Sequence, residues 1–247
     1  MGKVYLVTGG GGGIGSAIVE TIASNIQSGI IIVHYNSSKE PAEKLQKKLQ
    51  TKHVIIEIIQ ANLENKTDIE KMLDAILSRY KKVDVLINNA GYVEDMDFTN
   101  RKYEDFEKTF KINLYAPFLI SQRLGRTMVE NKYGRIINVS STNGLNTIYP
   151  TSIDYDASKA ALNSLTRNLA IEFAPYVNVN AILPGWVGTE MNKQLDTEFL
   201  ESEKRNILLE RFAEPREIAD LVLFLASDKA NYITAALIPI DGGIKIK

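Results

Sequence analysis

A tyrosine and a lysine four positions apart, Tyr155 and Lys159, are the residues in this chain best placed for acid–base chemistry. On a helix, this spacing puts both side chains on the same face, one turn apart. A phenol ordinarily keeps its proton to about pH 10, and a fixed cation nearby lowers that pKa toward neutral pH. The pair is therefore a candidate proton donor and acceptor. The alternative is an ordinary exposed helix face, on which the same spacing is common.

Five consecutive glycines, Gly9–Gly13, lie between an apolar stretch and a helical pattern that continues through Ile14 and Gly15. Residues without Cβ atoms let backbone N–H groups close on an anion, and the N-terminus of the following helix adds positive charge there. This is the arrangement that binds a dinucleotide pyrophosphate. The run fits both G-x-G-x-x-G and G-x-x-x-G-x-G, so it does not select its own frame, and a flexible tight turn is the alternative.

Composition narrows the partners that this chain could have. Its 29 basic and 30 acidic residues are intermixed and give a formal net charge of −1 over 247 residues. There is no electrostatic basis for binding nucleic acid or an anionic membrane, so we expect a small-molecule partner. No stretch is apolar for long enough to span a bilayer, and the N-terminus leads directly into a strand pattern. We therefore expect a cytoplasmic protein.

The chain has no cysteine and only two histidines, His34 and His53. The lack of thiols excludes disulfides, thiolate nucleophiles, iron–sulfur clusters and thiolate-rich zinc sites. Both histidines adjoin apolar runs. Their simpler interpretation is as strand-edge residues, with a metal or acid–base role as the alternative, and we expect no metal site.

Apolar, β-rich segments alternate with segments of helical period along the whole chain. The predicted strands are Val4–Thr8, Ile30–Tyr35, Val54–Gln60, Val83–Asn88, Arg135–Ser140, Val177–Leu183 and Leu237–Asp241. Repetition of strand, helix and strand predicts a parallel sheet. Because these seven strands are apolar almost throughout, helices should cover both faces, as in a doubly wound, Rossmann-type α/β fold. At this length we expect a single domain over residues 1–247.

Two predicted helices have recognisable start signals. Ser38 precedes a helix over Glu40–Leu49, and Asp154 precedes a helix over Tyr155–Ala174. Between residues 186 and 212 the pattern is instead irregular and charged, where simple alternation would lead straight into the next helix. We interpret residues 186–212 as an inserted substrate lid over the carboxyl edge of the sheet.

Further motifs, taken with the tyrosine–lysine pair, resemble those of the short-chain dehydrogenase/reductase family. They occur in that family's order: Thr8-Gly9-x-x-x-Gly13-Ile14-Gly15, Asn88-Asn89-Ala90-Gly91, Asn113, Asn138-Val139-Ser140-Ser141-x-x-Gly144, Tyr155-x-x-x-Lys159, Pro184-Gly185-x-x-x-Thr189 and Asp241-Gly242-Gly243. The first motif selects the frame Gly9, Gly13 and Gly15 for the glycine run. The resemblance covers nearly the whole chain and implies a nicotinamide-dependent oxidoreductase.

The resemblance also implies roles for four catalytic residues. Tyr155 would donate a proton to the substrate oxygen while hydride reaches its carbon, and Lys159 would hold the nicotinamide ribose and lower the pKa of the tyrosine. Ser141 would bind the substrate carbonyl, and Asn113 would anchor a water that relays protons. Ser141 is preferred to Ser140 because Gly144 follows it at the family's spacing, and Ser140 is interpreted as a buried strand hydroxyl.

By the same resemblance, a larger set of residues is expected to bind the cofactor. This set is Gly9, Gly12, Gly13, Ile14, Asn36, Ser37, Ser38, Asn62, Leu63, Asn89, Ala90, Gly91, Tyr155, Lys159, Pro184, Gly185, Val187 and Thr189. Within it, Thr189 resembles the residue that bonds the nicotinamide carboxamide, and Asn62 stands where the family commonly has an aspartate.

The sequence favours NADP(H) over NAD(H) as the cofactor. An NAD-specific site usually has an acidic residue at the end of the second strand, about twenty residues past the glycines. Here the chain has Asn36-Ser37-Ser38-Lys39, and no carboxylate occurs before Glu40. Hydroxyls, a helix N-terminus and a cation suit a 2′-phosphate. Gly12 stands where many NADP-preferring relatives have a basic residue, so use of NAD(H) remains open.

The substrate pocket is expected to be mixed and largely apolar. Its predicted lining is Tyr92, Val93, Asn143, Leu145, Ile148, Tyr149 and Gly185, covered by Trp186, Met191 and Leu195. Such a pocket suits a carbonyl or a secondary alcohol. The chain resembles most the branch of 3-oxoacyl-carrier-protein reductases and glucose dehydrogenases, so 3-oxoacyl thioester reduction is one hypothesis and a sugar or small-ketone oxidoreductase is the other.

Two further expectations concern the class of protein and its assembly. A non-catalytic dinucleotide sensor is the alternative from another class, but such proteins usually lose the tyrosine–lysine pair that this chain retains. The family commonly forms tetramers through its fourth and fifth helices, here Tyr103–Glu130 and Tyr155–Ala174, and its C-terminal segment. We therefore expect a homo-oligomer, either a tetramer or a dimer.

Overall fold

The computed structural model describes residues 2–189 and 196–244. Seven parallel strands form one sheet in the order β3-β2-β1-β4-β5-β6-β7. The strands are β1 (Lys3–Val7), β2 (Gly29–Tyr35), β3 (Val54–Gln60), β4 (Val85–Asn88), β5 (Gly134–Val139), β6 (Val177–Pro184) and β7 (Leu237–Ile240). Each predicted strand is confirmed to within two residues at either end. The predicted doubly wound, Rossmann-type sheet is therefore the observed one.

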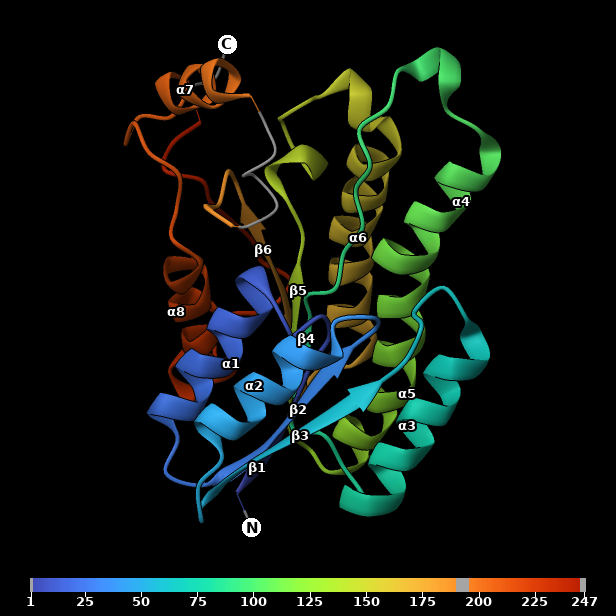
Figure 1. Ribbon diagram of the computed structural model, residues 1–247. Coiled ribbons are helices and arrows are strands. Elements are labelled where there is room, and N and C mark those ends of the chain that lie inside the picture. The colour runs from blue at the N-terminus through green and yellow to red at the C-terminus, as the bar shows by residue number, and fades with distance from the viewer. Residues whose placement is uncertain (1, 190–195, 245–247) are drawn as a thin grey trace.

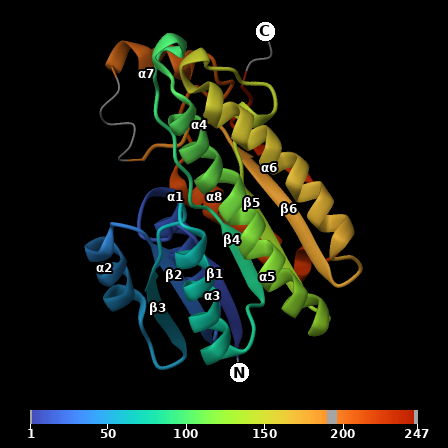
Figure 2. The same cartoon turned by 90° about the vertical axis from the view of Figure 1, so that its right-hand side faces the viewer.

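Helices cover both faces of the sheet (Figure 1). The helices are α1 (Gly13–Asn25), α2 (Lys39–Leu49), α3 (Lys66–Tyr80), α4 (Tyr103–Phe110), α5 (Ala116–Glu130), α6 (Ile153–Glu172), α7 (Thr197–Arg205) and α8 (Pro215–Ala226). Helices α1, α2 and α8 pack on one face, and α3, α5 and α6 pack on the other (Figure 2). Successive residues of each buried strand supply the two cores in turn, as with Val4 and Leu6 on one side and Tyr5 and Val7 on the other.

One expected long helix, Tyr103–Glu130, differs from the prediction. It consists of α4, a five-residue π-helical segment (Lys111–Tyr115) and α5. Asn113 lies in the middle of the π segment. Segments of this kind occur frequently at functional sites, because the widened turn changes the direction of a side chain.

The expected capping role of Asp154 is wrong. Helix α6 begins at Ile153, and Asp154 lies inside its first turn, fully buried. Its carboxylate accepts hydrogen bonds from the Thr109 hydroxyl at 2.5 Å and from the Arg101 guanidinium at 3.2 Å. Asp154 therefore bonds to side chains outside α6 instead of to the N–H groups of its own helix.

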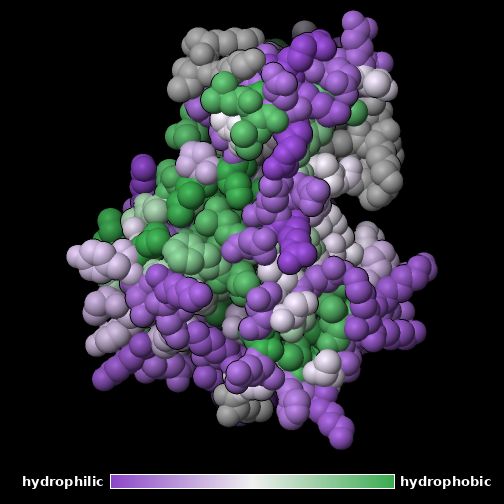
Figure 3. Space-filling view, turned by 90° about the vertical axis from the view of Figure 1, so that its left-hand side faces the viewer, coloured by the Kyte–Doolittle hydropathy of each residue, from purple (hydrophilic) through white to green (hydrophobic). Residues whose placement is uncertain are grey.

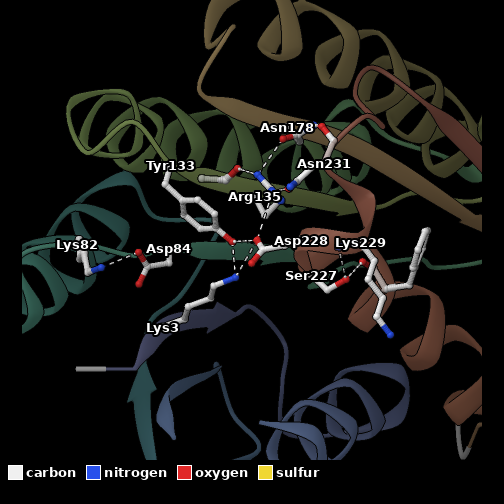
Figure 4. A network of polar contacts seen from close by, with 12 residues as sticks. Lys3, Lys82, Asp84, Tyr133, Arg135, Asn178, Ser227, Asp228, Lys229 and Asn231 are labelled. Carbon is white, nitrogen blue, oxygen red and sulfur yellow. Dashed lines mark hydrogen bonds and ion pairs between the residues drawn. The ribbon is translucent and has the colours of Figure 1, made fainter. Parts of the chain in front are cut away.

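A polar network closes the amino-terminal edge of the sheet (Figure 4). The Lys3 amine donates to the Tyr133 hydroxyl at 2.5 Å and to the Asp228 carboxylate at 3.3 Å. The buried Arg135 guanidinium lies over the Tyr133 ring, 4.9 Å from its centroid. This network ties β1 to the start of β5 and to the turn after α8. It leaves the carboxyl edge of the sheet as the open one, where parallel α/β folds bind ligands.

Candidate active site

A cavity of about 650 Å³ opens at the carboxyl ends of the central strands. Its lining includes every predicted cofactor-binding residue except Ser37, and it includes the catalytic candidates Ser141, Tyr155 and Lys159. The predicted residues on its wall are Gly9, Gly12, Gly13, Ile14, Asn36, Ser38, Asn62, Leu63, Asn89, Ala90, Gly91, Ser141, Tyr155, Lys159, Pro184, Gly185, Val187 and Thr189. Ser37 is exposed, and Asn113 is buried behind the wall.

The glycine turn has the geometry expected of the frame Gly9, Gly13 and Gly15. Gly9 and Gly13 have φ values of +62° and +51°, which residues with a Cβ rarely adopt. A Cβ on Gly15 would lie 2.1 Å from the Gly9 carbonyl oxygen, so this position also requires glycine. The N-cap of α1 is Gly12, which has no side chain to bond the first N–H groups of the helix. Those groups are therefore left for an anionic ligand, and the turn fits a dinucleotide pyrophosphate.

His34 is a site residue that the sequence interpretation missed. It is 2 % exposed at the end of β2, and its Nδ1 accepts a hydrogen bond from the Gly9 N–H at 3.1 Å. Its Nε2 lies 3.1 Å from the Ala61 carbonyl oxygen. Burial lowers the pKa of the imidazole to about 4, so the ring is neutral, with its proton on Nε2 toward that carbonyl. The only sequence signal was a polar residue at the end of an otherwise apolar strand beside β1.

Thr8 and Asn89 fasten the glycine turn to the end of β4. The Thr8 hydroxyl accepts hydrogen bonds from the backbone N–H groups of Asn89 and Ala90, both at 3.0 Å. In return, the Asn89 side-chain amide donates to the carbonyl oxygens of Thr8 at 2.9 Å and Gly9 at 3.1 Å. The two strand ends that line the cavity are therefore held together by side chains, and not only by the sheet ladder.

Helix α6 places Tyr155 and Lys159 on the same face, as the four-residue spacing predicts. The Lys159 amine lies 5.5 Å from the centroid of the Tyr155 ring and donates to the Val139 carbonyl oxygen at 2.9 Å. Tyr155 is half-buried on the cavity wall, and Lys159 is 3 % exposed. The pair is therefore part of the cavity and not an exposed helix face.

The expected lowering of the Tyr155 pKa by Lys159 is not what the structure shows. Burial raises the pKa of the phenol to about 12, the neighbouring Ser141 hydroxyl opposes this rise, and the Asp156 carboxylate adds to it. Desolvation lowers the pKa of the buried Lys159 amine to about 8, and the amine points to a carbonyl. In this state of the protein, the loss of water around the phenol is the largest effect on its pKa.

Asn113 bonds to the backbone beside the cavity. Its side-chain amide donates to the Tyr92 carbonyl oxygen at 2.9 Å and to the Ser158 hydroxyl at 3.0 Å, and its oxygen accepts from the Tyr92 N–H at 2.8 Å. A Cβ added to Gly91 would lie 3.6 Å from the Lys159 amine and 3.7 Å from the Asn113 amide oxygen. Asn113 is thus near Lys159 but separated from the cavity by the Gly91 backbone.

The structure separates the two serines that follow β5. The Ser140 hydroxyl is buried and donates to the Lys159 carbonyl oxygen at 3.2 Å, which agrees with a structural role, although Ser140 also lines the cavity. The Ser141 hydroxyl faces Asn143 and lies beside Tyr155. Gly144 is required because a Cβ there would lie 2.5 Å from the Lys159 carbonyl carbon. The motif therefore brings the loop after β5 against α6.

An aromatic cluster surrounds Trp186 on the cavity wall. Trp186 lines the cavity and packs edge-on against Tyr149 and Phe199, with centroids at 6.1 and 5.8 Å. The Glu203 carboxylate on α7 accepts from the Tyr149 hydroxyl at 2.6 Å and from the Trp186 indole N–H at 2.9 Å. The 186–212 segment therefore contacts the loop before α6 through this carboxylate and through Trp186, whose indole N–H also lies 3.1 Å from the Tyr149 hydroxyl oxygen.

The structure brings only part of the predicted substrate pocket to the cavity wall. Tyr92, Val93, Gly185 and Trp186 line the cavity, together with Ile112, which was not predicted. The remaining predicted residues are not on its wall: Asn143, Leu145, Ile148 and Tyr149. Leu145 and Ile148 are instead largely exposed. Met191 and Leu195 lie outside the described residues.

A parallel sheet with a glycine turn at β1 and a tyrosine–lysine pair beside the same cavity defines a dinucleotide-binding oxidoreductase fold. Comparisons with known proteins agree with this class. Residues 10–245 match a family described as "Enoyl-(Acyl carrier protein) reductase". The chain is 38% identical over 98% of its length to a 3-oxoacyl-[acyl-carrier-protein] reductase of Aquifex aeolicus, 97% of which is covered. It is 35% identical over 99% of its length to the Thermotoga maritima protein of the same name, 98% of which is covered.

Solved structures give the same result. A mutant of a Serratia marcescens short-chain dehydrogenase/reductase matches with a TM-score of 0.91 and 32% identity, covering 99% of this chain and 98% of that one. An acetoin dehydrogenase from Salmonella typhimurium matches with a TM-score of 0.88 and 32% identity. The match covers 99% of this chain and 96% of the acetoin dehydrogenase. The chain belongs to the short-chain dehydrogenase/reductase family. It is an oxidoreductase that interconverts a carbonyl and an alcohol with a nicotinamide dinucleotide.

Proposed function

We propose that this protein is an NADP(H)-dependent carbonyl reductase whose first candidate substrate is a 3-oxoacyl thioester. The observation that supports this substrate is full-length similarity, at 38% identity, to a reductase of 3-oxoacyl carrier-protein thioesters. One continuous cavity joins the glycine turn to the Tyr155 phenol, as a site for a dinucleotide beside its substrate requires.

In the proposed reaction, four side chains act on the substrate and the proton. The bound nicotinamide supplies or accepts the hydride. Tyr155 donates its proton to the substrate oxygen, and Ser141 donates a hydrogen bond that orients the carbonyl and stabilises the developing charge. Lys159 binds the ribose beside the phenol, and Asn113 fixes the Tyr92 backbone at the cavity wall and anchors the proton supply behind it.

The preference for NADP(H) rests on the groups around the N-terminus of α2. Ser38 is the N-cap of this helix but makes no capping bond with its side chain, so its hydroxyl and the Glu40 N–H are available to a 2′-phosphate. The Lys39 N–H is instead bonded to the Ser37 carbonyl oxygen at 3.0 Å. Asn36 and Ser38 line the cavity, and Ser37 lies between them on the surface. The Lys39 amine is 3.4 Å from Glu43 and exposed, so a bound phosphate could attract it. NAD(H) is the alternative cofactor.

A second candidate substrate is a small ketone. The observation that favours it is the bulky Trp186 ring on the cavity wall, which Glu203 holds through the indole N–H. The structural similarity to an acetoin dehydrogenase points the same way. A sugar substrate is a further alternative within the same family.

A panel of carbonyl compounds tests these proposals. It includes a 3-oxoacyl thioester, a diketone and an aldose, each assayed with NADPH and with NADH by the loss of nicotinamide absorbance. We expect the thioester to be reduced with the highest kcat/KM and NADPH to be used better than NADH. Faster reduction of the diketone would favour the small-ketone alternative, and a ratio of kcat/KM for NADPH over NADH below one would overturn the cofactor preference.

We also propose that residues 1–247 act as one cytoplasmic catalytic domain with the 186–212 segment as its lid. None of the helices in the described ranges is long and apolar enough to cross a membrane. In the described part of the lid, helix α7 contacts Tyr149 and Trp186 through Glu203.

Homo-oligomerisation is proposed on two apolar surfaces. Phe98, Tyr103 and Tyr115 are exposed around a groove along α4. Apolar side chains also gather on the α8 side of the molecule, where Phe224 is exposed (Figure 3). Burial of such surfaces favours association of copies. Light scattering should give a mass two or four times that of the chain, and a monomer would reject this proposal.

A further inference from the structure

His34 contacts the glycine turn at the point where the pairing of β1 with β2 ends. The parallel ladder between these two strands stops at Val7 and Val33. Beyond it, the His34 carbonyl oxygen accepts from the Gly10 N–H at 2.9 Å, and His34 Nδ1 accepts from the Gly9 N–H at 3.1 Å. One residue of β2 therefore supplies the acceptors for the first two glycine N–H groups of the turn.

The same ring also reaches the third strand, because β2 lies between β1 and β3 in the sheet. His34 Nε2 is 3.1 Å from the carbonyl oxygen of Ala61, the residue directly after β3. With Nδ1 as an acceptor the imidazole is neutral, so its proton is on Nε2 and is donated to this carbonyl. Asn62 and Leu63, which follow Ala61, line the cavity. The imidazole thus joins the glycine turn to the part of the cavity wall that follows β3.

Gly9 is held by side chains from both neighbours of β1. Its N–H donates to His34 on the β2 side, and its carbonyl oxygen accepts from the Asn89 amide at 3.1 Å on the β4 side. Asn89 belongs to a motif that resembles the family, whereas His34 lies outside all of those motifs. Glycine adopts many backbone conformations, and Gly9 has a φ of +62°. These two contacts therefore fix one conformation of the turn in the absence of a ligand.

The contacts of His34 also limit which N–H groups can bind a pyrophosphate. The N–H groups of Gly9 and Gly10 are already bonded to His34. The start of α1 remains, where Gly12 is an N-cap without a capping side chain. The position of this helix start depends on how the two preceding glycines are fixed. A turn that is fixed beforehand loses less conformational entropy when a ligand binds, and this raises affinity.

We propose that His34 is a positioning residue of the cofactor site, which fixes the glycine turn in its binding conformation before a dinucleotide binds. This inference rests on the proposed cofactor-binding residues, but it depends neither on the carbonyl substrate nor on the preference for NADP(H). Both dinucleotides carry the same pyrophosphate, so His34 should contribute equally to the affinity for each. Because the ring acts through the turn, kcat at saturating cofactor should not depend on it.

Three substitutions of His34 separate its two side-chain contacts. His34→Asn places an oxygen where Nδ1 lies, so it keeps an acceptor for the Gly9 N–H but is too short to reach Ala61. His34→Gln extends an amide toward the Ala61 carbonyl but leaves the Gly9 N–H without this acceptor. His34→Leu removes both contacts.

Asn180→Leu is the matched control for loss of a buried side chain that joins two backbone groups. Asn180 is 2 % exposed, as His34 is. Its amide donates to the Ile233 carbonyl oxygen at 2.9 Å, and its oxygen accepts from the Ala236 N–H at 3.0 Å. It lies on β6, which three strands separate from β2. The control therefore reports the effect of general destabilisation on cofactor binding.

The test measures binding, turnover and backbone exchange on the full chain. Nicotinamide fluorescence gives the dissociation constants of NADPH and NADH under conditions in which each variant is folded. His34→Leu and His34→Gln should weaken both by about tenfold, and His34→Asn should remain within about threefold of wild type. Without cofactor, amide hydrogen exchange across residues 8–13 should be faster in His34→Leu and His34→Gln only. In all four variants, kcat at saturating cofactor should be unchanged.

Four results would overturn the inference. Unchanged dissociation constants in His34→Leu would show that the ring does not position the turn. A loss confined to NADPH would place its effect at the 2′-phosphate. Equal weakening by Asn180→Leu would indicate general destabilisation, and affinity kept by His34→Gln but lost in His34→Asn would assign the effect to Ala61 alone. Failure of the carbonyl panel would reject the proposed substrates, but binding and exchange would still decide the role of His34.

Discussion

His34 accepts a hydrogen bond from the N–H of Gly9 at 3.1 Å, so the first glycine of the cofactor turn is held by a neutral, buried imidazole. The same ring faces the Ala61 carbonyl oxygen at 3.1 Å through its other nitrogen. Protonation would place an N–H on Nδ1 against the N–H of Gly9. The ring can make both contacts only while it is neutral.

This relationship predicts that stability depends on pH between about 6.5 and 4. The pKa of His34 is about 4 in the folded protein and 6.5 in the unfolded chain, so the unfolded state binds more protons within this window. Its contribution to the free energy of unfolding is full above about pH 6.5, falls as the pH is lowered through the window, and amounts to at most about 3 kcal/mol.

Urea unfolding at a series of pH values checks this prediction. Carboxylates that titrate below pH 5 contribute to every variant, so the difference between wild type and His34→Gln isolates the imidazole. His53→Gln is the matched control, because His53 is exposed. If the difference in unfolding free energy between wild type and His34→Gln is the same at every pH between 4 and 6.5, the pKa of His34 is not lowered by folding and the prediction is wrong.

Tyr155→Phe should abolish turnover and leave cofactor binding nearly intact. The substitution removes the proton donor but keeps the ring on the cavity wall. Loss of a general acid costs about 10² to 10⁴-fold in kcat. Initial rates with the best substrate of the carbonyl panel measure the loss, and nicotinamide fluorescence measures the dissociation constant of NADPH. Activity within tenfold of wild type would reject Tyr155 as the proton donor.

Lys159→Ala should reduce kcat and also weaken cofactor affinity. The amine is buried at the junction of β5 and α6, where its removal leaves the Val139 carbonyl oxygen without this donor and the cavity without its cation. The same two assays apply. Arg167→Ala, on the exposed side of α6, is the control. A variant with unchanged kcat and unchanged cofactor affinity would show that the lysine is only structural.

Arg101→Met should destabilise the fold by about 3–5 kcal/mol, because it leaves the buried Asp154 carboxylate without its cation. The side chains of Arg101 and Asp154 are 4% and 1% exposed, so water cannot replace the lost partner. Arg123→Met removes a surface pair with Asp74 and should change stability by less than about 1 kcal/mol. Urea unfolding compares the two, and equal effects would contradict the burial argument.

Glu203→Ala should loosen the lid over the substrate end of the cavity. The carboxylate is the acceptor for both the Tyr149 hydroxyl and the Trp186 indole. Trp186 is the only tryptophan of the chain, so quenching of its fluorescence by acrylamide reports its exposure. We expect stronger quenching and a raised substrate KM. Glu201→Ala, on the exposed side of α7, is the control, and identical quenching in both variants would show that Glu203 does not position Trp186.

Sequence patterns predicted the parts of this protein that depend on neighbours along the chain. The seven strands follow from continuous apolar runs, and the shared face of Tyr155 and Lys159 follows from helical period. The glycine frame was selected by motif resemblance, and the positive φ values of Gly9 and Gly13 explain it. The start of α6 was predicted less accurately. Aspartate is a common N-cap residue, but the Asp154 carboxylate accepts hydrogen bonds from Arg101 and Thr109 instead.

The features that were missed join residues far apart in sequence. Glu203 meets Tyr149 across 54 positions, and Arg101 meets Asp154 across 53. No local pattern distinguishes these side chains from ordinary surface charges. The same limit explains the error on the Tyr155 pKa: a spacing of four residues indicates a nearby amine, but it does not show how much water is removed from the phenol.

The sequence by itself determined the order of the strands and helices, the glycine turn and the tyrosine–lysine pair, because each is encoded by residue type and period within a short segment. Only the tertiary structure decided which distant groups surround them: the imidazole on Gly9, the guanidinium on Asp154 and the aromatic cluster at Trp186. The physical reason is that burial and hydrogen-bond partners, which control protonation, are properties of three-dimensional packing.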